Sequence, residues 1–136
     1  MDIQFTEEQE LLRSSVQRML RDQYDFDARR KIVASEEGLG RRQWDEFAEL
    51  GLLAAPFSEA VGGLSGGPLS TMIIMHEFGR HLVVEPFVET VVVAGSLIER
   101  AGSEAQKQAY IADIIAGSKL WTLAWTRSEE HTSELQ

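Results

Sequence analysis

Four side chains that could carry proton transfer or bind a metal lie close together in the sequence: His76, Glu77, Arg80 and His81. The two histidines are five residues apart, whereas a zinc-binding pair on one helix face is spaced by four. The chain contains no cysteine, so thiolate ligands and disulfides are excluded. Glu77 and Arg80 have the spacing of an ion pair. We therefore predict no metal site and no catalytic residue here, but a surface or inter-helix ion pair between Glu77 and Arg80.

A second candidate is the glycine-rich segment 62–67, which reads Gly-Gly-Leu-Ser-Gly-Gly. The backbone amides of such a loop can hold a phosphate in front of a helix. The segment lacks the Lys-Ser/Thr ending of a nucleotide-binding loop, and no strand of a βαβ unit precedes it. We interpret it as a flexible turn, so the residues alone predict no self-contained active site.

The elements that must position these residues are helical. Capping boxes formed by Thr6 with Gln9 and by Ser103 with Gln106 predict two helix starts. Apolar residues at helical spacing predict the rest. The predicted helices cover residues 6–20, a short stretch around 28–33, and residues 41–50, 67–82, 86–100 and 103–117. Residues 120–126 alternate weakly between apolar and polar types and predict the beginning of a strand.

The helix predicted over 86–100 has an unusual composition. Residues Val91–Ile98 leave almost no polar side for a full turn. A helix that is apolar all round is buried on all sides. We therefore expect a central core helix, or a helix that packs against another domain.

Composition restricts the class of protein. The 136 residues correspond to one domain, and 43% of them are hydrophobic. The net charge of −9 argues against nucleic acid or an anionic membrane as a partner. The longest apolar stretch is too short to span a bilayer, and no secretory signal is visible at the N-terminus. We expect a cytoplasmic protein.

The order of the motifs resembles the acyl-CoA dehydrogenase family, specifically its N-terminal α-helical domain, over about residues 1–126. Val61-Gly62-Gly63 stands where the family has Tyr-Gly-Gly. The stretches Tyr24–Phe26 and Gly66–Pro68 are most similar to the small subunit of pimeloyl-CoA dehydrogenase and related heteromeric enzymes. The other segments that carry the resemblance are Phe5–Gln9, Trp44–Leu53, Glu77–Arg80, Glu85–Phe87, Gly102–Lys107 and Ile115–Gly117.

The resemblance implies an FAD-dependent enzyme that dehydrogenates an acyl-CoA thioester between its α- and β-carbons, with hydride passing to the flavin. The catalytic base of the family lies in a C-terminal domain, so no catalytic residue is assigned in this chain. The helical domain would form a wall of the acyl pocket and contact other domains of a homo- or hetero-oligomer. By resemblance, Leu123 and Trp125 would contact the isoalloxazine ring, and Thr126 would offer a hydroxyl or amide to a polar flavin atom.

The expected organisation has three parts. Residues 1–119 form an all-α orthogonal bundle of about six helices, and residues 120–126 are the first strand of a missing middle β-domain. Residues 127–136 resemble the translation of a common sequencing adapter, so we hypothesise a non-native tail on an inactive fragment. Two alternatives stay open: a stand-alone helical interaction domain without a cofactor, and part of a non-catalytic subunit of a heteromeric dehydrogenase.

Overall fold

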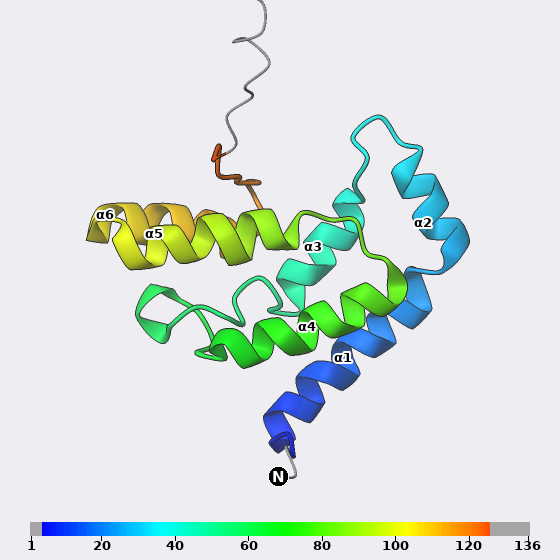
Figure 1. The fold of residues 1–136 in the computed structure, drawn as a ribbon, viewed down its shortest axis with the longest axis horizontal. Helices are drawn as coiled ribbons and strands as arrows, with labels where there is room; N and C mark the ends of the chain where they lie inside the picture. Colours follow the sequence, from blue (N-terminus) through cyan, green and yellow to red (C-terminus); the bar gives the residue numbers. More distant parts are fainter. Residues whose placement is uncertain (1–3, 126–136) are drawn as a thin grey trace, which may run out of the picture.

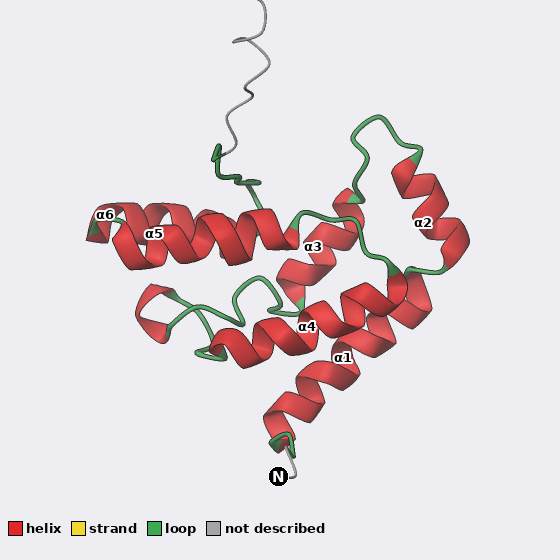
Figure 2. Cartoon of the chain, in the orientation of Figure 1, coloured by secondary structure: helices red, strands yellow, loops and turns green. Residues whose placement is uncertain are grey.

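The computed structural model describes residues 4–125, and every regular element within them is helical (Figures 1 and 2). The elements are α1 (Glu7–Gln23), α2 (Phe26–Val33), α3 (Arg41–Glu49), the short turn η1 (Glu59–Val61), α4 (Gly67–His81), η2 (Val88–Gly95), α5 (Ser96–Ala101), α6 (Glu104–Gln106), η3 (Lys107–Ile111) and α7 (Ala112–Ile115). Because η2 continues into α5, and α6, η3 and α7 follow one another directly, six helical rods result. The predicted all-α bundle of about six helices is confirmed.

The helix starts follow the predicted capping chemistry. The Gln9 amide donates to Thr6 Oγ1 at 3.3 Å, and the Gln9 side chain accepts from the Thr6 amide at 2.9 Å. Ser103 and Gln106 make the same reciprocal pair at the start of α6. Within residues 4–125, no helix combines the length and hydropathy needed to cross a bilayer.

The strand predicted over residues 120–126 is not formed in residues 120–125. Residues 120–125 have no regular secondary structure, and the described part of the chain contains no strand at all. A strand needs a neighbour to complete its hydrogen bonds, and no segment between residues 4 and 125 provides one. Thr126 and the tail 127–136 lie outside the described residues.

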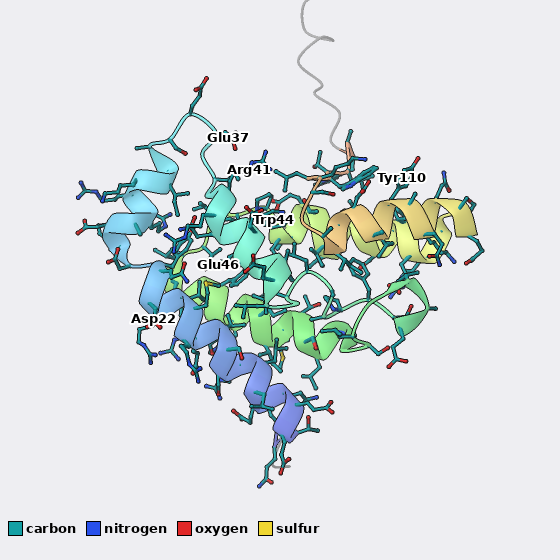
Figure 3. All side chains as sticks on the ribbon, turned by 180° about the vertical axis from the view of Figure 1, so that it is seen from behind. Asp22, Glu37, Arg41, Trp44, Glu46 and Tyr110 are labelled. Atoms are coloured by element: carbon teal, nitrogen blue, oxygen red, sulfur yellow. The ribbon has the colours of Figure 1, made fainter. Side chains whose placement is uncertain are left out.

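The core is built around aromatic rings from several elements. Phe47 of α3 stacks on Phe78 of α4 with ring centroids 4.7 Å apart, and Phe78 meets Phe87 edge-on at 5.4 Å. The buried Trp44 donates its indole N–H to the carbonyl of Gly117 at 3.2 Å, which ties α3 to the end of α7. Figure 3 shows Trp44 near the middle of the molecule.

A buried polar pair joins three connections between helices. The hydroxyl of Tyr24, at the end of α1, donates to Glu85 Oε2 at 2.7 Å and accepts from the Val84 amide at 3.0 Å. The other oxygen of Glu85 accepts from the Gly40 amide at 2.9 Å. A side chain at position 40 would place its Cβ 2.9 Å from that oxygen, so glycine permits the close approach. Burial, more than the Glu85 hydrogen bond, raises the pKa of Tyr24 and keeps the hydroxyl a neutral donor.

A second buried carboxylate holds α1 against α4. Glu77 is 1% exposed, and its Oε1 accepts from Gln17 at 3.0 Å and from Arg13 at 3.3 Å. The predicted ion pair with Arg80 is wrong: Arg80 is exposed, and the cationic partner of Glu77 is Arg13 on α1. Burial acts to raise the pKa of Glu77, but hydrogen bonds from Gln17, His76 and Arg13 outweigh it and hold that pKa below its ordinary value.

Replacing Tyr24 with phenylalanine should lower the free energy of unfolding by about 1–3 kcal/mol, because it leaves Glu85 Oε2 and the Val84 amide without their partner. The control is Tyr110→Phe, since the Tyr110 hydroxyl makes no hydrogen bond within residues 4–125. We expect urea denaturation to separate the two variants clearly. Equal stabilities would contradict the assigned role of the Tyr24 hydroxyl.

Glu77→Gln should destabilise the chain most at neutral pH. A carboxyl with a depressed folded pKa contributes stability above its unfolded pKa, and this is lost as the pH falls through the folded value. The difference in unfolding free energy between wild type and E77Q should therefore shrink between about pH 6 and about pH 3. Chemical denaturation across this range measures it, with the exposed Glu36→Gln as control. Parallel pH profiles for wild type and E77Q would count against the result.

Candidate functional site

A shallow apolar groove lies along α5, and we call it the α5 groove. Its volume is about 380 Å³. The residues that line it are Ala94, Leu97, Ile98, Ala101, Gly102, Gln106, Tyr110, Trp121, Thr122 and Leu123. None of these side chains carries a charge at neutral pH, so the groove suits a hydrocarbon or another apolar surface rather than an ion.

The α5 groove exists because the apolar helix has one buried and one open side. Thr90 and Val91 are buried, whereas Leu97, which lines the groove, is 47% exposed. The expectation of a central core helix is therefore wrong within the described part of the chain, and the alternative of a helix that packs against another domain stays a prediction. An exposed apolar side of this kind is typical of a surface that a partner or ligand covers.

The helix on which the groove rests is packed closely from below. Gly95 ends η2, and a Cβ at this position would lie 2.4 Å from the ring of Phe57. The absence of a side chain lets the Phe57 ring reach the helix backbone. Both η2 and η3 are π-helical, a form of helix that is rare and often found at functional sites.

The segment that leaves the bundle forms one side of the groove. The indole of Trp121 packs on Tyr110 with ring centroids 4.9 Å apart. The backbone of Trp121 makes two hydrogen bonds with the side chain of the buried Thr90. Figure 3 labels Tyr110 at this end of the molecule.

The structure places two of the three residues that were predicted to contact a flavin. Leu123 lines the α5 groove and is 40% exposed. Trp125 is 78% exposed, and its amide donates to the carbonyl of Leu123 at 3.0 Å. Thr126 lies outside the described residues. The flavin contacts themselves stay a prediction.

Backbone amides of the glycine-rich loop donate hydrogen bonds to carbonyls of this chain. The amide of Leu64 donates to Ala54 O at 3.1 Å, and that of Gly66 donates to Ala55 O at 2.8 Å. The amides of Gly63 and Ser65 likewise bind the carbonyls of Ser58 and Phe57. With these donors occupied, the loop is a hydrogen-bonded turn and offers no cradle for a phosphate.

Each histidine of α4 makes a hydrogen bond to a neighbouring group of the same helix. His76 Nδ1 lies 3.2 Å from Glu77 Oε1, and His81 Nδ1 lies 3.1 Å from the Glu77 carbonyl at the end of α4. In the range 4–125, no three His, Cys, Asp or Glu side chains gather as a metal centre requires.

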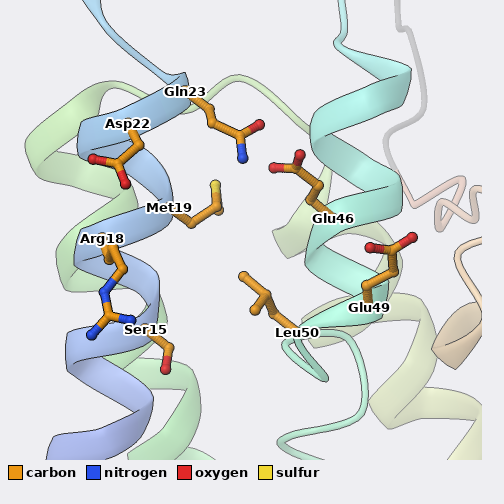
Figure 4. A pocket seen from close by; sticks show the side chains of 8 residues that line it. All are labelled: Ser15, Arg18, Met19, Asp22, Gln23, Glu46, Glu49 and Leu50. Carbon is orange, nitrogen blue, oxygen red and sulfur yellow. The ribbon is translucent and has the colours of Figure 1, made fainter.

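A larger cleft between α1 and α3 has a different character (Figure 4). Its volume is about 470 Å³, and three carboxylates and one guanidinium surround it. Gln23 and Glu46 point toward one another across the cleft. Its full lining is Ser15, Arg18, Met19, Asp22, Gln23, Glu46, Glu49 and Leu50. This polar cleft does not suit an apolar ligand, whereas the uncharged lining of the α5 groove does.

Curated relatives are similar to this sequence over most of its length. FadE27, an acyl-CoA dehydrogenase of Mycobacterium tuberculosis, is 26% identical over 70% of this chain and 26% of its own. The short-chain specific acyl-CoA dehydrogenase of Clostridium acetobutylicum is 27% identical over 97% of this chain and 35% of its own. The acryloyl-CoA reductase (NADH) of Anaerotignum propionicum is 24% identical over 93% and 32%. The chain thus spans about a third or less of the length of these relatives.

Solved structures share the fold. The ChsE4–ChsE5 complex from Mycobacterium tuberculosis superposes with a TM-score of 0.86 at 24% identity, covering 96% of this chain and 36% of the other. Butyryl-CoA dehydrogenase from Megasphaera elsdenii superposes with a TM-score of 0.69 at 24% identity, covering 88% and 32%.

The family model described as the acyl-CoA dehydrogenase N-terminal domain matches residues 6–118, which include all the helices from α1 to α7. The resemblance carried by the sequence motifs is thereby confirmed. The chain belongs to the acyl-CoA dehydrogenase family, of which it carries the N-terminal helical domain.

Proposed function

We propose that this chain is the helical part of an FAD-dependent acyl-CoA dehydrogenase that introduces a double bond between the α- and β-carbons of an acyl-CoA thioester. The single observation that carries the proposal is the solvent-exposed apolar α5 groove on a domain of this family. An acyl chain or an apolar domain face would remove this surface from water, and that burial is favourable.

The side chains at the groove suit a flavin beside it. Leu123 and Trp125 offer apolar and aromatic surface at the end of the described chain, and such surface matches a planar isoalloxazine ring. FAD, when bound, would take up the hydride that leaves the substrate. The roles of this chain are then to wall the acyl pocket and to hold the segment that leads to the flavin.

The fragment by itself should be inactive. It matches about a third of the length of its relatives. The resemblance places the catalytic base in a part that this sequence does not include. We further propose that residues 127–136 are an adapter-derived tail, that residues 120–126 open a β-domain in the parent, and that the parent is cytoplasmic.

A non-catalytic subunit of a heteromeric dehydrogenase is a second candidate. The ChsE4–ChsE5 structure that this chain resembles is a complex of two different chains. The resemblance to small subunits of heteromeric enzymes points the same way. In either case the parent would be an oligomer whose ligand is an acyl-CoA.

The gene continuing beyond codon 126 tests the proposal. The expressed parent should be yellow with bound FAD, and an acyl-CoA panel should bleach the flavin when no electron acceptor is present. Trp125→Ala should reduce flavin occupancy, whereas Leu11→Ala, a change at a residue that is 68% exposed on α1, should not. A flavin-free parent would favour the stand-alone interaction domain, and a yellow protein that no acyl-CoA bleaches would favour the non-catalytic subunit.

The 136-residue chain alone should bind the dye 1,8-ANS at the α5 groove, because this apolar surface lacks its cover. Leu97→Ser should weaken dye binding severalfold, since Leu97 is half-exposed in the groove. Val33→Ser on α2 is the matched control, because Val33 is 50% exposed away from the groove. Dye fluorescence that falls equally in both variants would show that the groove is not the binding surface.

A further inference from the structure

We propose that Thr90 is the positioning residue for the segment 121–125, and that its hydroxyl sets where this side of the α5 groove stands. Contact of Leu123 and Trp125 with a flavin rests on the proposed function, whereas the positioning of the segment by Thr90 does not.

The geometry at Thr90 is a closed pair of hydrogen bonds. Its hydroxyl donates to the Trp121 carbonyl at 3.0 Å, and the Trp121 amide donates back to the same oxygen at 3.1 Å. Thr90 is 0% exposed, so water does not compete for these bonds. A hydroxyl can donate and accept at once, which an ammonium, a carboxylate or a methyl group in this place cannot do.

The hydroxyl has been freed from its usual helical role. A threonine within a helix commonly turns its hydroxyl to the carbonyl one turn earlier. Here the Pro86 carbonyl accepts from the Thr90 amide at 3.0 Å, and the Thr90 hydroxyl faces Trp121. The Thr90 hydroxyl thus bonds a chain segment 31 residues away.

Thr90 supplies the hydrogen bonds that hold the segment to the helices. Within residues 4–125, the two Thr90 bonds are the only hydrogen bonds between residues 120–125 and the helices. The buried indole N–H of Trp121 has no partner among the described residues, so the ring is held by packing, on Tyr110 and against the hydrophobic core. Lys119 bonds Asp113 at 2.7 Å, but this ion pair is on the surface and precedes the segment.

The position of the groove wall follows from the two hydrogen bonds between Thr90 and Trp121, which we call the Thr90 clamp. Leu123 lies two residues beyond Trp121, and it lines the groove while remaining 40% exposed. Two residues of extended chain span at most about 7 Å, so a chain held at Trp121 keeps Leu123 within that distance. Loss of the clamp would let Leu123 leave the groove without unfolding the helices.

The test is amide hydrogen exchange on the 136-residue chain, read residue by residue by NMR. Thr90→Val keeps the shape and removes the hydroxyl, so the Trp121 amide should exchange about tenfold faster or more. Thr90→Ser keeps the hydroxyl and should restore protection. Thr71→Val is the control, because the Thr71 hydroxyl bonds only within α4, to Gly67 O at 3.4 Å. The T90V variant should also bind 1,8-ANS several times more weakly, with T90S close to wild type.

Unchanged exchange at Trp121 in T90V, or T90S behaving as T90V, would overturn the proposal. If T90V does not fold, the wild-type chain still decides: its Trp121 amide should be protected like those of the neighbouring helix, and a freely exchanging amide overturns the clamp. Since no flavin takes part, failure of this test leaves the proposed function standing. A flavin-free parent would leave the clamp standing.

Discussion

The buried pair of Tyr24 and Glu85 is the constraint on which the helical arrangement depends. One carboxylate is satisfied by donors from the end of α1 and from the loop before α3, while it sits at the turn between α4 and η2. A buried carboxylate that loses a hydrogen-bond partner lowers the stability of the fold, and this penalty holds the three connections together. Pro86 and Phe87 follow at once, and Phe87 enters the aromatic core. The starting point and direction of η2 are therefore fixed by this pair.

From that starting point, local packing decides which side of the helix faces solvent. Gly95 accepts the ring of Phe57 on one side, which seats η2 close to the core. The opposite side carries Leu97 into the α5 groove, where the Trp121 segment meets it. The exposed apolar surface is thus a consequence of how tightly the other side is packed. The chain spans about a third of its relatives' length, and we propose that further domains cover this surface.

The local features of the fold could be predicted from the sequence, because they depend on neighbouring residues. The capping boxes at Thr6 and Ser103 and the proline at the start of α4 gave the correct helix starts. Long-range pairs were missed: Glu77 met Arg13 at a separation of 64 residues, where spacing alone suggested Arg80. The same reason hides Thr90 and Trp121, since no local pattern marks a hydroxyl that bonds a distant backbone. The apolar run 91–98 identified an unusual helix, but its hydropathy could not tell a core from an uncovered face.

We propose that the α5 groove is an internal surface of the parent protein. The most direct measurement compares hydroxyl-radical footprints of this chain with those of the same residues in the complete parent. We expect Leu97, Tyr110 and Leu123 to lose reactivity in the parent, while Leu50, 44% exposed in the cleft between α1 and α3, keeps its own. Equal reactivity of the groove residues in both proteins would contradict it.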